Sequence, residues 1–279
     1  MGIGAESRAM LSRIISGVVL AVGIVLVLLK SPWWGFGIVI GLAAALGSNE
    51  YIRMARPKSS SGERSIFIAI VTVVSCAPMI TRVAPTLDHS TLLTIGFVLL
   101  MIVRLANPKP IENALNRASL DICGLMYLGV TFPLIFDLRV QTDDGWLVLL
   151  AMVITFASDT GGYFAGRLLG KHKLYPTVSP KKTIEGAVGG LIAVVGGTYL
   201  LSKNIDSLST LTPMHCVAIG GLGACMAIIG DLVESLMKRA FGVKDSGALI
   251  PGHGGILDRI DGLLFCGPFV WIYLRICFQ

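Results

Sequence analysis

The chain has 279 residues, of which 54% are hydrophobic and only 14% are charged, and its mean hydropathy is +0.77. Soluble domains carry about 25% charged residues, so this composition excludes an ordinary soluble enzyme, a disordered chain and a small disulfide-rich secreted module. A net charge of +6 would point to nucleic acid in a soluble protein. In so apolar a chain it points instead to membrane topology and anionic lipid, and we expect no nucleic-acid partner.

Nine continuous apolar runs predict an all-α polytopic transmembrane helix bundle of about nine spans, because a helix needs about 20 mostly apolar residues to cross a bilayer. The runs are approximately 11–29, 33–46, 66–80, 92–105, 120–136, 146–169, 184–201, 213–236 and 260–278. They are not alternating, which argues against a barrel. We expect an N-terminal bundle of about five spans (1–145) and a catalytic region of about four (146–279), together forming one integrated membrane unit.

The distribution of charge predicts the orientation. With nine spans, 18 Lys and Arg residues fall on the side of the N-terminus and five on the opposite side. The positive-inside rule then places the N-terminus in the cytoplasm. The acids divide into 12 and five, so the whole excess charge lies on the predicted cytoplasmic face.

The first polar stretch ends the sixth run and has the sequence SDTGGYFAGR over residues 158–167. Tyr163 and Gly166 follow Asp159 at i+4 and i+7, so a helix presents all three on one face. A carboxylate at or inside the bilayer edge is costly and tends to mark a functional site. The alternative is an aspartate that only hydrogen-bonds the backbone at a helix break.

The second polar stretch precedes the seventh run and has the sequence SPKKTIEG over residues 179–186. Ser179 followed by Pro180 is typical of a helix start. Lys181 and Lys182 beside a helix N-terminus form an anion site, because positive charge and free N–H groups converge there. The alternative is that the two lysines only fix the topology of the span.

The third polar stretch, residues 230–261, joins the last two runs and is the richest. Four polar residues of the eighth run share one helix face: Asp231, Glu234, Ser235 and Lys238. Asp258 and Asp261, three apart, share a face at the start of the ninth run. The acids of the two helices can therefore converge across the glycine-rich turn, unless they merely pair with Lys238.

Clustered carboxylates repel one another unless a cation or a proton intervenes. Mg²⁺ binds oxygen ligands and is typically held by one or two carboxylates together with substrate phosphates. Several bases in the same stretch are available for those phosphates: Lys238, Arg239, Lys244 and Arg259. Acids for a metal and bases for phosphate at a membrane surface are typical of phosphoryl or nucleotidyl transfer.

The third stretch resembles the signature of the CDP-diacylglycerol synthases, or phosphatidate cytidylyltransferases. The residues that carry the resemblance are SLMKR at 235–239, KDSG at 244–247, PGHGG at 251–255 and DRID at 258–261. The stretches around Asp159 and at 179–186 also resemble motifs of this family. The resemblance covers about the last 120 residues, and the first half agrees only in being a bundle of spans.

The resemblance implies condensation of CTP with phosphatidic acid to CDP-diacylglycerol and pyrophosphate, with Mg²⁺ as cofactor and a second cation left open. It implies a catalytic role for Asp231, Ser235, Lys238, Asp258 and Asp261. The expected metal ligands are Asp231, Asp258, Asp261 and Glu234. Substrate binding is expected of Asp159, Ser179, Lys181, Lys182, Glu185, Arg239, Lys244, Asp245, His253 and Arg259.

Three alternatives stay open at this point. A polyprenol or phytol kinase, or a CDP-archaeol-type synthase, would use similar chemistry on another lipid. An ion-coupled transporter would place the acids near the bilayer midplane, whereas the runs place them at span ends. We expect an integral protein of a bacterial inner membrane with its site facing the cytoplasm, and the sequence leaves open whether it forms a homodimer.

Overall fold

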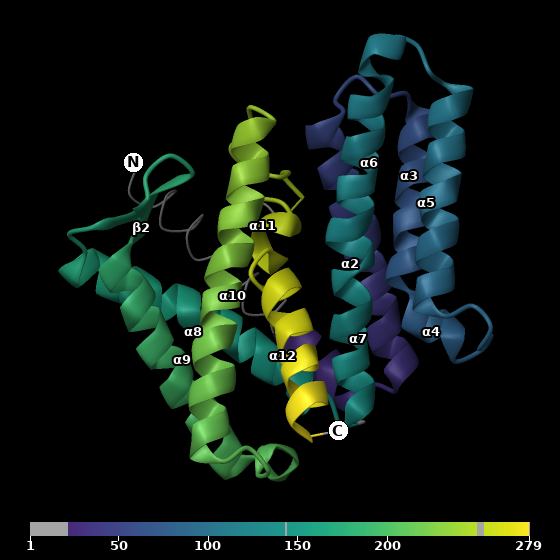
Figure 1. Cartoon of the computed structure of the whole chain (residues 1–279). Helices are drawn as coiled ribbons and strands as arrows, with labels where there is room; N and C mark the ends of the chain where they lie inside the picture. The colour runs from purple at the N-terminus through teal and green to yellow at the C-terminus, as the bar shows by residue number, and fades with distance from the viewer. Residues whose placement is uncertain (1–21, 143, 250–253, 279) are drawn as a thin grey trace, which may run out of the picture.

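The computed structural model describes residues 22–142, 144–249 and 254–278, most of them helical (Figure 1). The helices form two groups that lie side by side. The first group consists of α2 (Trp33–Ala55), α3 (Ser61–Ser75), α4 (Ala77–Thr81), α5 (His89–Ala106), η1 (Ile111–Asn113), α6 (Ala114–Gly129) and α7 (Thr131–Gln141). The second consists of α8 (Trp146–Leu169), β1 (Lys173–Tyr175), β2 (Ser179–Thr183), α9 (Ile184–Asn204), η2 (Asp206–Leu208), α10 (Pro213–Ala240), α11 (Leu257–Ile260) and α12 (Leu263–Phe278).

Seven helical segments of the described chain are long and apolar enough to cross a membrane, so the protein is an all-α polytopic membrane protein. They are Trp33–Ala55, His89–Ala106, Ile111–Gln141, Trp146–Leu169, Ile184–Asn204, Pro213–Ala240 and Leu257–Phe278. The third predicted run forms α3, which has only 15 residues, and the short α4. The first predicted run lies largely outside the described residues, so the total of nine spans stays a prediction.

Side chains at the helix starts explain where two helices of the first group begin. Ser60 accepts a hydrogen bond from the backbone N–H of Glu63 at the start of α3. Asp88 accepts one from the N–H of Thr91 at the start of α5, and hydrogen bonds from Thr91 and Ser90 lower the pKa of Asp88. Each cap satisfies an N–H group that the first turn of a helix leaves without a partner.

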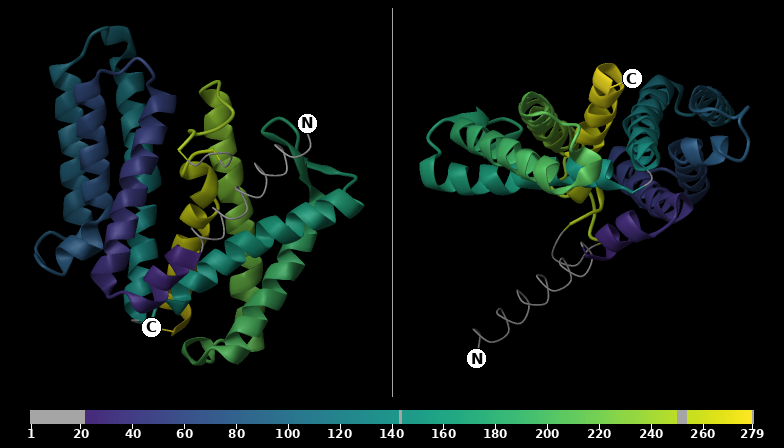
Figure 2. Two further views of the ribbon diagram at one scale, coloured as in Figure 1. Left: turned by 180° about the vertical axis from the view of Figure 1, so that it is seen from behind. Right: turned by 90° about the horizontal axis from the view of Figure 1, so that it is seen from below.

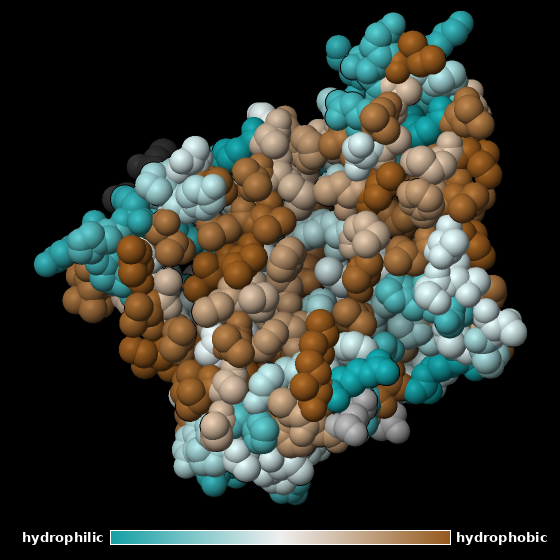
Figure 3. All heavy atoms as spheres, in the orientation of Figure 1, coloured by the Kyte–Doolittle hydropathy of each residue, from teal (hydrophilic) through white to brown (hydrophobic). Residues whose placement is uncertain are grey.

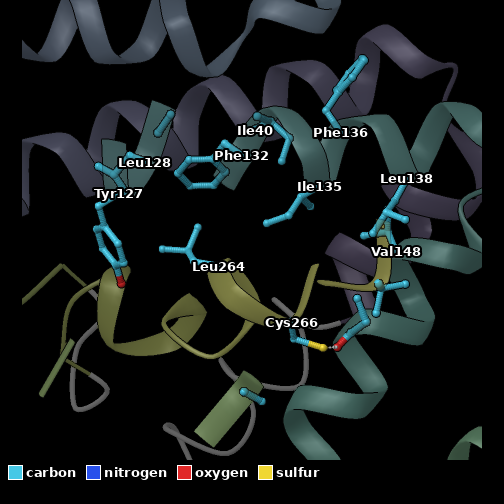
Figure 4. Close-up of a cluster of buried hydrophobic side chains, with 14 of the residues drawn as sticks. Ile40, Tyr127, Leu128, Phe132, Ile135, Phe136, Leu138, Val148, Leu264 and Cys266 are labelled. Carbon is cyan, nitrogen blue, oxygen red and sulfur yellow. Dashed lines mark hydrogen bonds between the residues drawn. The ribbon is translucent and has the colours of Figure 1, made fainter. Parts of the chain in front are cut away.

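One apolar core joins the two groups of helices. Figure 4 shows Phe132 and Ile135 of α7 facing Leu264 and Cys266 of α12, with Val148 of α8 beside them. These side chains are all buried. Because α7 packs on α12 through this core, the site described below is built against the first group of helices rather than apart from it.

Helices α8 and α9 approach each other through glycine. A Cβ atom added to Gly190 would lie 2.6 Å from the carbonyl oxygen of Ser158, and one added to Gly186 would lie 2.8 Å from that of Gly162. Small residues let helix backbones come this close in lipid. The glycines at the start of α9 therefore bring Asp159 on α8 close to the chain that carries Lys181 and Lys182.

The hairpin between α8 and α9 corrects the expected helix start at Ser179. Residues Ser179–Thr183 form strand β2, which pairs antiparallel with β1 so that Lys173 lies opposite Thr183. The helix begins only at Ile184, where Thr183 accepts a hydrogen bond from the N–H of Gly186. Ser-Pro is compatible with an extended strand as well as with a helix start, and pairing with β1 decides between them.

The connections alternate between two ends of the molecule. Three connections lie at one end: those between α2 and α3, between α5 and α6, and after α10 (Figure 1). The hairpin points toward the same end. From behind and from below, the hairpin lies on the side away from α3 and α5 (Figure 2). Apolar side chains cover the middle of the face in Figure 3, with hydrophilic ones toward both ends.

Candidate functional site

A pocket of about 300 Å³ lies between α8, the hairpin, α9 and α10. Its polar lining comes from the first two polar stretches and includes Asp159, Tyr163, Arg167, Lys181 and Lys182. Asp159, Tyr163 and Gly166 all line it, which confirms that they share one face of α8. The Tyr163 hydroxyl accepts a hydrogen bond of 2.9 Å from Arg167.

An ion pair joins the second polar stretch to the third at this pocket. Lys182 Nζ lies 2.6 Å from Asp231 Oδ2, and the two side chains are 23% and 25% exposed. Ser235 Oγ donates to Asp231 Oδ1 over 3.2 Å. The hairpin therefore brings Lys182 onto α10, and neither partner is withdrawn from solvent.

The hairpin is itself held in place by Glu185. The carboxylate of Glu185 accepts hydrogen bonds from the backbone N–H groups of Lys171 and His172, and lies 2.6 Å from His172 Nδ1. Glu185 thus fastens the end of α8 to the start of α9. The contacts describe a residue that shapes the hairpin, while its expected role in binding substrate stays a prediction.

A second group of charges lies on the adjacent part of α10. Lys238 pairs with the fully buried Glu234 on the same helix and reaches Asp258 Oδ1 at 2.6 Å. Asp258 Oδ2 accepts hydrogen bonds from the N–H and hydroxyl of Ser246 and from the N–H of Gly255, all at 2.8–3.0 Å. A carboxylate has about four acceptor positions, and Lys238 together with the N–H groups of Ser246 and Gly255 already occupies three of those of Asp258.

Asp261 directly follows α11, at a point where the chain passes close to α10. It accepts a hydrogen bond of 2.8 Å from the N–H of Gly262, and a Cβ atom on Gly230 would lie 2.5 Å from its carbonyl oxygen. Its carboxylate lies within electrostatic range of Asp231 and Asp159. Asp261 is thus an electrostatic neighbour of an acid on α8 and an acid on α10, and Lys182 is a neighbour of those two acids.

The described residues hold no group of three or more Asp, Glu, His or Cys side chains close enough to bind a metal ion together as they stand. The chemistry of the donors nevertheless fits a hard divalent cation, because Asp231, Asp261 and Asp159 offer oxygen and repel one another unless positive charge intervenes. Lys182 supplies positive charge at Asp231 in this arrangement.

The remaining expected substrate-binding residues are less enclosed. Arg239, Lys244, Asp245 and Arg259 are exposed, and Ser179 is half-buried in β2. Arg239 donates to the carbonyl oxygen of Val243 over 3.2 Å. His253 lies outside the described residues. The roles of these residues stay predictions.

Asp231 and Asp159 lie well inside their helices rather than at the helix ends. Asp231 lies nine residues before the end of α10, and Asp159 lies ten before the end of α8. Both helices contact a neighbouring element of this region: α8 contacts β2, and α10 contacts α11. At 1.5 Å per residue the two acids are about 14–15 Å from the helix ends.

Two residues of the first group of helices that the sequence does not single out reach the C-terminal site. Glu50 of α2 accepts hydrogen bonds from Ser246 Oγ and from the N–H groups of Ile256 and Leu257. The buried hydroxyl of Tyr127, on α6, points toward the α11–α12 chain in Figure 4 and has Glu234 among its electrostatic neighbours. Glu50 lies four residues beyond the predicted apolar run 33–46, on the part of α2 that continues past that run, so the run itself carried no signal for it.

Membrane-spanning helices with acid–base pairs beside a pocket define an integral membrane protein with the chemistry of a phosphate-handling enzyme. The family model described as the cytidylyltransferase family matches residues 11–277. The match covers nearly the whole chain, including the N-terminal half, and the chain belongs to this family.

Relatives named phosphatidate cytidylyltransferase match the chain as well. A phosphatidate cytidylyltransferase of Staphylococcus saprophyticus is 34% identical over 216 residues, which cover 75% of this chain and 80% of the relative. One of Staphylococcus haemolyticus is 35% identical over 75% of this chain and 78% of the relative. The chloroplastic phosphatidate cytidylyltransferase 5 of Arabidopsis thaliana is 32% identical over 94% of this chain and 69% of its own length.

Proposed function

We propose that this membrane enzyme transfers the cytidylyl group of CTP to phosphatidic acid, giving CDP-diacylglycerol and pyrophosphate for phospholipid synthesis. The family match and the relatives named phosphatidate cytidylyltransferase support the reaction. The observation that carries the choice of site is the Lys182–Asp231 ion pair at the pocket between α8, α9 and α10. In this pair Lys182, a base that can contact phosphate, lies beside Asp231, an acid that can bind a cation, and both are partly exposed.

The chemistry requires positioning more than proton transfer. A phosphomonoester has a second pKa of about 6, so the phosphate of phosphatidate is largely deprotonated at pH 7. One of its oxygens attacks the α-phosphorus of CTP, and the bond from that phosphorus to the oxygen bridging to the β-phosphate breaks. Pyrophosphate leaves with the electron pair. The site must bring two polyanions together, align them and stabilise the charge of the leaving group.

The cations of the pocket suit that task. Lys182 and Lys181 lie on the hairpin at its rim, and Arg167 lies across from them on α8. Together they bind phosphate oxygens of the two substrates in this proposal, and their charge offsets the repulsion between the polyanions. Asp231 orients the Lys182 ammonium through its 2.6 Å contact.

We propose Mg²⁺ as the cofactor, with Asp231 and Asp261 as its protein ligands and Asp159 beside them. When bound, Mg²⁺ neutralises phosphate charge and aligns the nucleotide. Of the other two expected ligands, Glu234 is fully buried against Lys238, and Asp258 already accepts hydrogen bonds from Ser246 and Gly255. These contacts favour Asp231 and Asp261 over them.

The depth of the site suits a lipid headgroup. Helix α10 has 28 residues. At 1.5 Å per residue it is about 42 Å long, some 12 Å longer than a hydrocarbon core of about 30 Å. If the surplus lies at the end near the hairpin, Asp231 lies close to the membrane surface, where the phosphate of phosphatidate is found. We place this surface on the cytoplasmic side of a bacterial plasma membrane, since CTP is a cytosolic nucleotide.

A double-label assay tests the reaction. The purified protein in detergent receives phosphatidate, Mg²⁺ and CTP labelled at either the α- or the γ-phosphate. Cytidylyl transfer puts the α label into the lipid fraction and the γ label into pyrophosphate. Label from the γ-phosphate in lipid would show a kinase instead, and no lipid label in either arm would overturn the proposal.

Matched variants tie the activity to the site. Asp231→Asn removes the carboxylate that pairs with Lys182 of the pocket lining, whereas Asp206→Asn makes the same change at an exposed residue of η2, at the opposite end of the molecule. We expect α-label transfer by the Asp206 variant and none above background by the Asp231 variant. Phosphatidate and archaeal-type lipid phosphate are supplied in parallel, since similar chemistry acts on both.

A further inference from the structure

Glu50 is a buried acid of the N-terminal helix group whose partners all belong to the chain between α10 and α12. Its side chain lies on α2, and the residue is only 6% exposed. Oε2 accepts hydrogen bonds of 2.9 Å from Ser246 Oγ and 3.0 Å from the N–H of Leu257. Oε1 accepts one of 2.9 Å from the N–H of Ile256. The partners are separated from Glu50 by about 200 residues of sequence.

Two of these donors are the N–H groups at the start of α11. Ile256 precedes the helix and Leu257 is its first residue. The first turn of a helix leaves its N–H groups without intrahelical partners, and here a carboxylate from another helix accepts from them. Helix α2 also packs directly on this turn, since a Cβ atom on Gly47 would lie 2.9 Å from Leu257 Cδ2.

The loop closes around the Glu50 carboxylate because two of its residues are glycine. A Cβ atom on Gly255 would lie 2.4 Å from Glu50 Oε2, and one on Gly247 would lie 2.7 Å from Glu50 Oε1. No real Cβ atom approaches an oxygen so closely. A Cβ atom at either position would displace the Glu50 carboxylate from its hydrogen-bond donors, and one at Gly255 would also meet Ser246 Oγ at 2.1 Å.

Ser246 links Glu50 to the charged group on α10. Its hydroxyl contacts Glu50 Oε2 at 2.9 Å and Asp258 Oδ2 at 3.0 Å. Asp258 in turn lies 2.6 Å from Lys238 Nζ. A continuous set of polar contacts thus runs from α2 through Ser246 and Asp258 to Lys238.

We propose that Glu50 is a positioning residue of the transferase: it fixes the chain around Ser246 and the start of α11, and thereby sets the positions of Asp258, Asp261 and Lys238. This inference rests on the proposed function for its effect on turnover. Glu50 is held by hydrogen bonds inside the protein and has no contact with the pocket. Burying a carboxylate in an apolar helix is costly, and three charge-assisted hydrogen bonds to this loop offset that cost.

Glu50→Gln is the direct test. The amide keeps the size of the side chain but replaces one acceptor oxygen by an NH₂ group, which faces donors and cannot accept from them. We expect the kcat for α-label transfer to fall about 10- to 100-fold, as for other residues that orient a site through a neighbour, with KM for CTP changed less than threefold. Glu112→Gln, an exposed acid of η1, is the matched control and keeps wild-type turnover.

Hydrogen exchange separates positioning from general stability. Ile256 and Leu257 donate to different oxygens of Glu50, so in the Glu50→Gln variant one of these two amides loses its acceptor. The peptide covering residues 254–258 therefore exchanges faster, while the α8–α9 peptides exchange at the wild-type rate. This readout does not depend on activity, so it tests the contact even if the wild-type protein forms no CDP-diacylglycerol. Unchanged exchange at 254–258 overturns the proposal.

Ser246→Ala provides a second variant that removes one hydroxyl and no charge. We expect kcat to fall about tenfold, and the Glu50→Gln/Ser246→Ala double variant to be no worse than the Glu50→Gln variant within a factor of three, because both changes break the same set of contacts. Independent effects that multiply, or wild-type kcat in the Ser246→Ala variant, would contradict a shared role. So would a kcat loss in the Glu50→Gln variant that only follows a lower folded fraction.

Discussion

Two sets of paired charges lie in the two helix groups, and their surroundings differ. In the first group Asp121 of α6 bridges Arg56 and Arg104, each at 2.9 Å, and Glu63 contacts both arginines. The Asp121 side chain is 1% exposed and the arginines are 5–6% exposed. In the second group the Lys182–Asp231 pair is about one quarter exposed beside a pocket.

The difference in exposure separates two roles of acid–base pairs: holding helices together and offering charges to a ligand. The first set contains two acids and two bases whose charges balance. Asp121 and both arginines are buried and Glu63 is 15% exposed, so the set ties α2, α3, α5 and α6 together. The second set keeps solvent access, and its acids within electrostatic range come from three helices. Removing one partner of a buried ion pair lowers the stability of the fold. An exposed ion pair contributes little to stability, and its charges remain accessible to a ligand.

The largest effect is expected from Asp231→Asn. The change removes the partner of Lys182 and a proposed Mg²⁺ ligand at the pocket, so turnover of CTP should fall about 10³-fold, which is ~4 kcal/mol of barrier. Because Asp231 is partly exposed, the midpoint of thermal unfolding should move by less than ~2 °C. Steady-state turnover and a melting curve on one preparation check both. Turnover within tenfold of wild type would remove Asp231 from the catalytic residues.

The next effect, on stability, is expected from Asp121→Asn. It leaves Arg56 and Arg104 buried with their shared acid removed, which costs about 3 kcal/mol. The midpoint of thermal unfolding should fall by roughly 6–12 °C, while the chains that remain folded turn over normally. Asp206→Asn, at an exposed aspartate, is the control and should melt with the wild type. A variant that melts like the wild type would show that the buried set is dispensable.

A smaller effect is expected from Lys182→Gln. The substitution keeps a hydrogen-bond donor but removes the charge proposed to contact substrate phosphate. We expect kcat/KM for CTP or phosphatidate to fall about 30-fold, or ~2 kcal/mol. Titrating each substrate at saturating levels of the other shows which KM rises. Values within threefold of wild type for both substrates would place the phosphates elsewhere.

The smallest effect is expected from Lys181→Gln. Lys181 is exposed on β2 and its neighbour Lys182 is the one that contacts Asp231. An exposed charge contributes up to ~1 kcal/mol, so kcat/KM should fall by about threefold at low salt and less at high salt. Lys58→Gln, an exposed lysine of the first helix group, controls for the general loss of charge. A loss at Lys181 larger than at Lys182 would reverse the proposed roles.

Contacts within one helix could be predicted from the sequence. The spacing of Asp159, Tyr163 and Gly166 put them on one face, and they line one pocket. The i+4 spacing of Glu234 and Lys238 predicted their ion pair as an alternative, and the structure has it. These predictions need only the period of the helix.

Contacts between helices could not be predicted in this way. Asp231 pairs with Lys182 of the hairpin rather than with Lys238, and Glu50 contacts a loop some 200 residues further along the chain. Arg56 and Arg104 were counted only as loop charges that fix topology, although both are buried in ion pairs. Such partners depend on how the helices pack, which periodicity does not specify.

The extended conformation of β2 also could not be predicted from the sequence, because it depends on pairing with another strand. Ser179-Pro180 is compatible with a helix start, but pairing with β1 keeps residues 179–183 extended, and Thr183 caps the helix instead. The metal ligands show another limit, since an i+3 spacing put Asp258 and Asp261 on one face. Their contacts differ nonetheless, because Ser246 and Gly255 already donate to Asp258.

The most direct test of this contrast is α-label transfer from CTP to phosphatidate per folded chain, measured side by side for the Asp231→Asn and Asp121→Asn variants. Both changes replace one aspartate by asparagine, and the folded fraction is taken from the melting curve of each sample. We expect wild-type transfer per folded chain for Asp121→Asn and at least a hundredfold loss for Asp231→Asn. Equal transfer by the two variants would contradict this expectation.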